Sequence, residues 1–306
     1  MANDISKTGI LLESGTNELE LLEFVVGGQH FGINVAKIRE LCNYEIPTPI
    51  PNSHEYIEGI YMPKDMLITA INLAKALGIP KEDNPSTDMY IVTNFNRVYT
   101  AFHVDQVVGI HRLSWEDMVK PDTTMSSAAN ASAIGVVKIN GKVILVLDFE
   151  KILSEINPES GLRVSEIDML GERDRSDVKI LLAEDSAMLL EMMKDCLSKA
   201  GYVNLIPTSN GLEAWKELNK IIDDGGKIGE DISCVITDIE MPQMDGHRLL
   251  KLIKDDRRFN KLPVIIFSSL VNEEMRVKGK SLGADAQLSK PEIGNLVKMI
   301  DSLIGK

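Results

Sequence analysis

Acidic, basic and hydroxyl side chains that could handle a phosphoryl group follow apolar runs of strand length in the second half of this 306-residue chain. They are Glu184 with Asp185, then Asp238, Ser268 and Lys290. Clustered carboxylates repel one another unless a cation neutralises them, and Mg²⁺ prefers oxygen ligands. An ammonium and a hydroxyl beside them could contact phosphoryl oxygens, and one carboxylate could attack phosphorus. These residue types predict a magnesium-dependent phosphoryl site.

A structural role is the alternative for some of these residues. Aspartate and serine directly after a strand often cap the next helix, so Asp185 or Ser268 taken alone would more often be structural. Their joint placement argues for a site, together with the block Asp238–Gly246, which reads D-I-E-M-P-Q-M-D-G.

The elements that must position these residues alternate between strand and helix from Val178 onward. Five strands that are each followed by a helix predict a parallel, doubly wound α/β sheet, and ligands of such sheets bind beyond the carboxyl ends of the strands. The predicted strands are Val178–Ala183, Val203–Thr208, Ile232–Thr237, Pro263–Phe267 and Ala286–Ser289, and the predicted helices are Met188–Ala200, Leu212–Ile222, Gly246–Lys254, Glu273–Leu282 and a last helix to Ile304.

The first half of the chain has a different periodicity, with apolar residues that alternate in short runs between turn signals. Gly27-Gly28 and Asn140-Gly141 each separate two such runs, which predicts two β-hairpins. Many short strands indicate an all-β barrel or sandwich. Residues 158–177 are rich in charged residues, Ser, Gly and Pro, which predicts a solvated linker between domains at 18–157 and 178–306.

The composition argues against several classes of partner. The net charge is −13, from 33 basic and 46 acidic residues, so a nucleic-acid backbone would repel the chain. The sequence lacks an apolar stretch of about 18 residues, as a transmembrane helix needs, and its start does not resemble a secretory signal. We therefore expect a cytoplasmic protein with no nucleic-acid partner and no direct membrane insertion.

The second half, over about residues 178–306, resembles the response-regulator receiver domains of two-component signalling. The matching motifs are Glu184-Asp185, the block Asp238–Gly246, Ser268 after a P-V-I-I-F strand, and Lys290-Pro291. Matched together and in this order, they are highly specific.

The resemblance implies that Asp238 accepts a phosphoryl group from a kinase phosphohistidine. It also implies a bound Mg²⁺, held by the side chains of Asp185 and Asp238, by the backbone carbonyl of Glu240, and by Glu184 through water.

Two further positions gain a role from the same resemblance. Lys290 and Ser268 would contact the phosphoryl oxygens, and Ser268 would act in the switch with the residue at 287. The family often has Tyr or Phe at that place, whereas this chain has Gln287. Glu240 is an extra acid two residues after the acceptor, and we expect it to alter dephosphorylation.

The first half resembles the CheW adaptors of chemotaxis, through the stretch Leu22–Glu40 and the segments 47–51, 56–60 and 71–73. The resemblance implies two small SH3-like β-barrels packed together, without a catalytic centre. It carries partner-binding positions to Ile38, Glu40, Gly59 and Lys64; a place in the core is the alternative for Ile38, and the family usually has arginine where this chain has Lys64.

A CheW-like adaptor followed by a receiver is the arrangement of the CheV family of chemotaxis coupling proteins. It implies a signalling adaptor, not an enzyme, which couples the cytoplasmic tips of chemoreceptors to the histidine kinase CheA at membrane-associated arrays. Phosphorylation of Asp238 would then adapt the kinase output. Two alternatives are a phosphate sink for CheA and a metal-dependent aspartyl phosphatase, in which Glu240 would be the general acid.

Overall fold

The computed structural model of this chain describes residues 15–81, 84, 86–95, 98–120, 132–157, 162, 164–171, 173–270 and 272–305. Within these residues the chain divides into two units. The first is residues 18–157, and the second joins residues 15–17 to the residues from 162 onward. No helix in the described ranges combines the length and apolarity that a membrane crossing requires.

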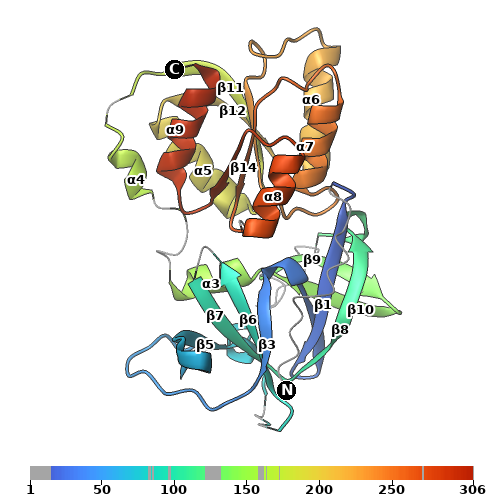
Figure 1. Ribbon diagram of the computed structural model, residues 1–306, viewed down its shortest axis with the longest axis vertical. Helices are drawn as coiled ribbons and strands as arrows, with labels where there is room; N and C mark the ends of the chain where they lie inside the picture. The colour runs from blue at the N-terminus through green and yellow to red at the C-terminus, as the bar shows by residue number, and fades with distance from the viewer. Residues whose placement is uncertain are drawn as a thin grey trace. The chain divides into compact units, whose positions relative to one another are not determined.

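The second unit contains a five-stranded parallel sheet with the strand order β12-β11-β13-β14-β15. Its strands are β11 (Ser176–Ala183), β12 (Tyr202–Thr208), β13 (Cys234–Thr237), β14 (Val264–Ser268) and β15 (Ala286–Ser289). Its main helices are α5 (Ala187–Lys199), α6 (Gly211–Asp223), α7 (Gly246–Asp255), α8 (Glu273–Ser281) and α9 (Ile293–Ile304). Figure 1 shows α5 and α9 on one face of the sheet and α6, α7 and α8 on the other. The predicted doubly wound sheet is confirmed.

Burial explains why the two inner strands β13 and β14 are apolar along their length. They are buried at every residue, because helices cover both faces of the sheet. In these two strands, hydroxyl side chains appear only at the last residue, as Thr237 and Ser268.

The segment before β11 differs from the solvated linker that its composition predicted. It contains the short helix α4 (Ser165–Asp168), and Ile167 is buried in the same core as α5 and α9. The Glu166 carboxylate accepts a hydrogen bond from the Gly294 N–H of α9 at 3.0 Å. Spaced apolar residues such as Leu162 and Ile167 make this packing possible, although charged neighbours dominate the composition. Residues 158–161, 163 and 172 of the predicted linker lie outside the described residues.

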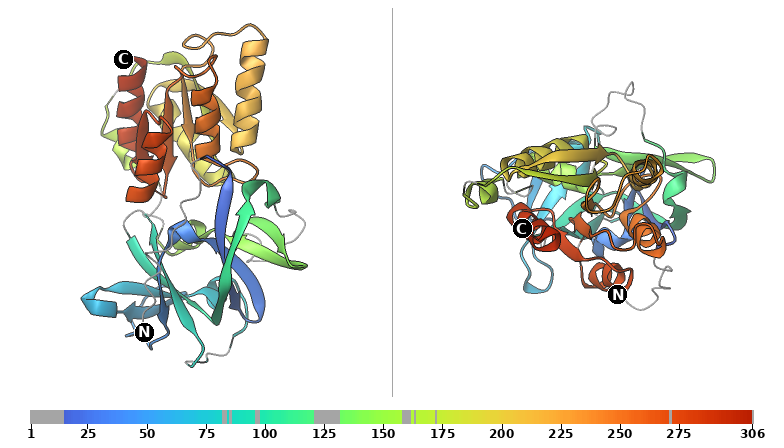
Figure 2. Two further views of the ribbon diagram at one scale, coloured as in Figure 1. Left: turned by 45° about the vertical axis from the view of Figure 1, so that its right-hand side comes forward. Right: turned by 90° about the horizontal axis from the view of Figure 1, so that it is seen from above.

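The first unit is built from two five-stranded β-sheets. One has the order β8-β1-β2-β10-β9. Its strands β1 and β8 pair antiparallel and lie side by side in Figure 1 and in the left view of Figure 2. Its strands are β1 (Glu18–Val26), β2 (Gln29–Asn34), β8 (Gln106–Ser114), β9 (Ala133–Ile139) and β10 (Lys142–Leu147). The other has the order β3-β6-β7-β5-β4, with β3 (Ile38–Asn43), β4 (Ile57–Tyr61), β5 (Ile68–Asn72), β6 (Met89–Phe95) and β7 (Val98–Val104).

Short helical segments connect these strands. They are η2 (Val35–Lys37), η3 (Pro63–Asp65), α1 (Leu73–Ala76), η4 (Trp115–Asp117) and α3 (Phe149–Ile156). The predicted hairpins are confirmed: Gly27 and Gly28 link β1 to β2, and Asn140 and Gly141 link β9 to β10. All four turn residues have positive φ angles, which Gly and Asn adopt at low steric cost.

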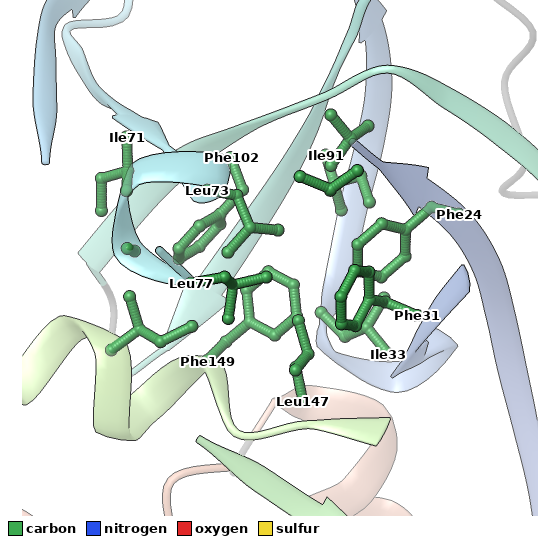
Figure 3. Close-up of a cluster of buried hydrophobic side chains, with 14 of the residues drawn as sticks. Phe24, Phe31, Ile33, Ile71, Leu73, Leu77, Ile91, Phe102, Leu147 and Phe149 are labelled. Atoms are coloured by element: carbon green, nitrogen blue, oxygen red, sulfur yellow. The ribbon is translucent and has the colours of Figure 1, made fainter. Parts of the chain in front are cut away.

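A shared hydrophobic core joins the two sheets (Figure 3). The Phe149 ring of α3 lies 6.1 Å from the Phe24 ring of β1 and 4.4 Å from the Phe102 ring of β7, measured between centroids. Because all three side chains are fully buried, α3 connects one sheet to the other through aromatic contacts. Each sheet also has a smaller buried cluster of its own, which agrees with two packed β-modules.

Truncating the central ring of this core tests its contribution. We expect Phe149→Ala to lower the free energy of unfolding of the first unit by about 3–5 kcal/mol, since a fully buried ring is lost and a cavity remains. Urea unfolding measures the change. Val143→Ala, on a side chain that is 63% exposed, is the control and should change stability by less than about 0.5 kcal/mol. Equal effects of the two substitutions would contradict the role of Phe149.

Candidate functional site

The polar residues at the strand ends of the second unit come together at one edge of its sheet. Asp238 and Lys290 are each 6% exposed, and Glu184 and Ser268 are each 1% exposed. One carboxylate oxygen from each of Glu184, Asp185 and Asp238 lies within 4.8 Å of the others. The parallel sheet is the cause, because β11, β13, β14 and β15 all end at this edge.

Lys290 links two of the carboxylates. Its Nζ lies 2.7 Å from Asp238 Oδ2 and 3.1 Å from Glu184 Oε2. The backbone reinforces the pair, since the Lys290 N–H donates to the Ser268 carbonyl at 3.2 Å and so joins the ends of β14 and β15. One ammonium therefore faces two buried carboxylates, and the half-buried Asp185 adds a third acid to the cluster.

The titration of Glu184 is perturbed in this cluster. Burial raises the pKa of Glu184 to about 7, and repulsion by Asp238 acts in the same direction while Lys290 opposes it. A buried acid with a strongly raised pKa beside charged neighbours is typical of a functional site. The three carboxylates are also oxygen donors of the kind that Mg²⁺ prefers, and a divalent cation there would compensate the surplus negative charge. The donor set therefore fits this metal.

The loop after Asp238 is folded tightly against this residue. Asp238 Oδ1 accepts a hydrogen bond from the Ile239 N–H at 2.6 Å, and the Gly246 N–H donates to the Ile239 carbonyl at 2.9 Å. A Cβ atom at Gly246 would lie 1.9 Å from the Asp238 carbonyl oxygen, so only glycine fits where the loop returns to α7. Glu240, in the same loop, is 5% exposed.

Neighbouring residues carry the helix caps that Asp185 and Ser268 could have formed. The Ser186 side chain accepts from the Leu189 N–H and caps α5, and the Asn272 side chain accepts from the Met275 N–H and caps α8. Asp185 and Ser268 are therefore not the caps of these two helices, and their role in phosphoryl transfer stays a prediction. The Ser268 hydroxyl instead accepts from the Leu270 N–H at 3.2 Å, within the loop between β14 and α8.

Gln287 connects β15 to α8. Its Nε2 donates to the Arg276 carbonyl at 2.8 Å, and a Cβ at Gly279 would lie 2.4 Å from its Oε1. Gln287 is paired in register with Ile266 of β14, whereas Ser268 is paired with Ser289. The amide of Gln287 thus bonds to α8, the helix that follows Ser268 in the chain. The switch role of Gln287 stays a prediction.

The four partner-binding positions predicted in the first unit have different surroundings. Ile38 is half-buried and packs against the shared core, while Gly59 is buried where a Cβ would lie 2.2 Å from the Thr48 carbonyl oxygen. Gly59 therefore has a structural reason to be glycine. Glu40 and Lys64 are accessible and lie close together, with Lys64 Nζ 3.7 Å from Glu40 Oε2 and the Lys64 side chain 78% exposed.

Two residues that the sequence analysis did not select lie next to these sites. Arg39 is stacked over the Tyr99 ring at 4.4 Å and its Nε lies 3.8 Å from Glu40 Oε1. Asn17, which precedes β1, is bonded to the loop after Asp238. The position of Arg39 beside Glu40 could have pointed to it, whereas the contact of Asn17 spans more than 220 residues and leaves no local signal.

Comparison with known proteins agrees with this architecture. The family model described as "CheW-like domain" matches residues 20–157, and the one described as "Response regulator receiver domain" matches residues 180–301. Chemotaxis protein CheV3 of Helicobacter pylori is 28% identical over 302 residues, which cover 95% of this chain and 96% of that protein. Chemotaxis protein CheW of Thermotoga maritima is 30% identical over 151 residues, which cover 49% of this chain and 98% of that protein.

The chain belongs to the CheW-like family, in the two-domain arrangement of the CheV proteins. The second unit is its receiver domain. It is also similar to chemotaxis protein CheY1 of Helicobacter pylori, with 27% identity over 121 residues that cover 40% of this chain and 91% of that protein. A CheW-like coupling domain and a receiver of chemotaxis signalling are thus combined in one chain.

The raised pKa of Glu184 has a consequence for stability. Between the usual pKa of 4.5 and a folded value of about 7, the folded state binds a proton that the unfolded state has lost. Stability should therefore fall as pH rises through this window, by roughly 3 kcal/mol if the whole shift is expressed. In Glu184→Gln this contribution is absent, so we expect the variant to gain stability over the wild type between pH 5 and pH 8.

Urea unfolding of both proteins in buffer treated with a chelator measures this difference. Glu191→Gln, on an exposed side chain of α5, is the control and should follow the wild type at both pH values. A difference between wild type and Glu184→Gln that does not change with pH would contradict the raised pKa.

Proposed function

We propose that this protein is a chemotaxis adaptor, coupling chemoreceptors to the histidine kinase CheA, and that phosphorylation of Asp238 regulates the coupling. The observation that supports the regulated step is the buried Asp238 carboxylate bonded to Lys290 at 2.7 Å. The observation that supports the coupling is the CheW-like domain in the same chain.

The chemistry of the receiver follows from the site. A carboxylate oxygen of Asp238 attacks phosphorus while the bond from phosphorus to the histidine nitrogen breaks, which leaves an acyl phosphate on Asp238 and a neutral imidazole on the donor after proton uptake. The Lys290 ammonium already lies beside Asp238 and can pair with a phosphoryl oxygen, and the Ser268 hydroxyl can donate to another. Transfer and hydrolysis at the receiver itself are the only chemistry that the proposal assigns to this adaptor.

A bound Mg²⁺ would supply charge neutralisation between the acidic residues and the phosphoryl group. We assign it to the side chains of Asp185 and Asp238, the carbonyl of Glu240, and Glu184 through water. A cation bound by these residues would also let the site accept an incoming anion, which their negative charge would otherwise repel.

We place the limits of the CheW-like domain at residues 18–157. One surface of this domain is suited to protein partners. Glu40 and Lys64 form an accessible ion pair, and the large apolar side chains of Met62 and Leu67 near Lys64 in the chain are 60% and 68% exposed. Exposed apolar side chains beside charged ones are typical of a protein-binding surface. We assign CheA and the cytoplasmic receptor tips to this domain, and location at receptor arrays follows from these partners.

Substituting the acceptor tests the receiver. We expect phosphorylated CheA to label the wild-type chain in the presence of Mg²⁺ and to leave Asp238→Asn unlabelled, because an amide cannot accept the phosphoryl group in this way. Transfer of radioactive phosphate followed by gel analysis measures the result. Asp255→Asn, on an exposed residue at the end of α7, should be labelled like the wild type. Labelling of Asp238→Asn at the wild-type rate, or steady turnover of a small phosphate ester that depends on Asp238, would contradict the proposal.

Reversing one charge tests the adaptor surface. We expect Glu40→Lys to weaken binding to receptor and kinase arrays by about tenfold, because it replaces attraction with repulsion at Lys64 and at the partner. Co-sedimentation with arrays at increasing protein concentration measures the affinity. Glu55→Lys makes the same change on an exposed residue outside this surface and should bind like the wild type. Equal binding of Glu40→Lys and the wild type would exclude this surface.

A further inference from the structure

A short segment before β1 belongs to the receiver unit. We call residues 15–17 the strap, since they join the receiver core although more than 140 residues separate them from it in the chain. Gly15 and Asn17 are buried, and Asn17 is only 5% exposed. A Cβ at Gly15 would lie 2.8 Å from Lys251 Cδ of α7, so the strap approaches this helix closely.

The Asn17 side chain bonds the loop that follows the acceptor at two points. Its Oδ1 accepts a hydrogen bond from the Asp245 N–H at 3.0 Å, and its Nδ2 donates to the Gln243 carbonyl at 2.9 Å. Both polar atoms of one buried amide are thus used on backbone groups of this loop. A third bond runs from Arg248 Nη1 to the Gly15 carbonyl at 3.3 Å.

The two loop residues that Asn17 contacts control the shape of the loop. Gln243 has a φ of 69°, a left-handed conformation that costs energy for a residue other than glycine. Asp245 is the N-cap of α7, and its side chain accepts from the Arg248 N–H at 2.6 Å. Asn17 therefore holds the loop at its strained residue and at the point where it enters the helix.

The same loop carries groups that the proposed function uses. It starts at Asp238, contains the Glu240 carbonyl that we assign to the metal, and is closed by the bond from the Gly246 N–H to the Ile239 carbonyl. The Gly211 N–H at the start of α6 donates to the Met244 carbonyl at 3.1 Å and holds one point of this loop. The amide of Asn17 adds hydrogen bonds at the positions on either side, Gln243 and Asp245.

We infer that Asn17 is a positioning residue for the acceptor site, which fixes loop 239–245 from a segment outside the receiver motifs. The inference rests on the proposed function of Asp238. In the chain, Asn17 directly precedes Glu18, the first residue of β1.

The substitution Asn17→Gly in the full chain tests the inference with little backbone strain. Asn17 itself has a φ of 67°, which glycine adopts freely, so the variant removes the side-chain bonds and preserves the backbone. We expect Mg²⁺ binding, measured by calorimetry, to weaken by about fivefold, which is the value of about one net hydrogen bond. We expect labelling of Asp238 by a small acyl phosphate, at Mg²⁺ below saturation, to slow by a similar factor.

Two control variants separate positioning from stability. Asn260→Ala removes an exposed asparagine side chain beyond the far end of α7 and should leave both measurements unchanged. Ile300→Val destabilises the receiver core at α9, away from the loop, and should also leave the Mg²⁺ affinity of the folded protein unchanged. A loss of Mg²⁺ affinity in Asn17→Gly that Ile300→Val does not share supports positioning.

The possible negative results are distinguishable. Equal Mg²⁺ affinity and equal labelling of the wild type and Asn17→Gly would overturn the role of Asn17 and leave the proposed function intact. A wild type that binds Mg²⁺ but is not labelled at Asp238 would contradict the proposed function, while the calorimetry would still decide the role of Asn17. A wild type that does not bind Mg²⁺ would overturn both.

Discussion

One ammonium group faces several carboxylates at the carboxyl edge of the receiver sheet, and this clustering of charge is the main constraint on the site. Lys290 lies between Asp238 and Glu184, and Asp185 adds a further acid at the same edge. Burying a carboxylate costs free energy, and burial raises the pKa of Glu184 as a result. Buried strands behind the site keep these groups together in spite of the repulsion. The clustering of these acids around one ammonium is the basis for the proposal that a cation and a phosphoryl group bind here.

Structural and chemical roles are divided between neighbouring residues around this site. Ser186 and Asn272 cap α5 and α8, so Asp185 and Ser268 are not needed as the caps of these helices. Gly246 allows the loop to return within van der Waals contact of the acceptor, because it has no Cβ. The geometry beside Asp238 therefore depends on backbone and capping groups that take no part in phosphoryl transfer.

Some parts of the fold could be predicted from the sequence, and others could not. The receiver strands and helices were predictable because each has a strong local period, and the turn at Asn140-Gly141 was predictable because few residue pairs adopt its φ angles. The packing of α4 was not, since Leu162, Ile167 and Leu170 are scattered among charged and polar residues and only the folded structure brings them into the core beside α5 and α9. Composition over twenty residues averages out such a signal.

The sequence by itself determined which side chains meet at the candidate site. Each of them follows a predicted strand, and a parallel sheet brings the ends of its strands to one edge; they are Glu184, Asp185, Asp238, Ser268 and Lys290. The tertiary structure alone decided how the loop after the acceptor is held. Asn17 and Asp245 are separated by 228 positions, and no local pattern records a hydrogen bond over that distance. Burial likewise raises the pKa of Glu184, since only folding removes its carboxyl group from water.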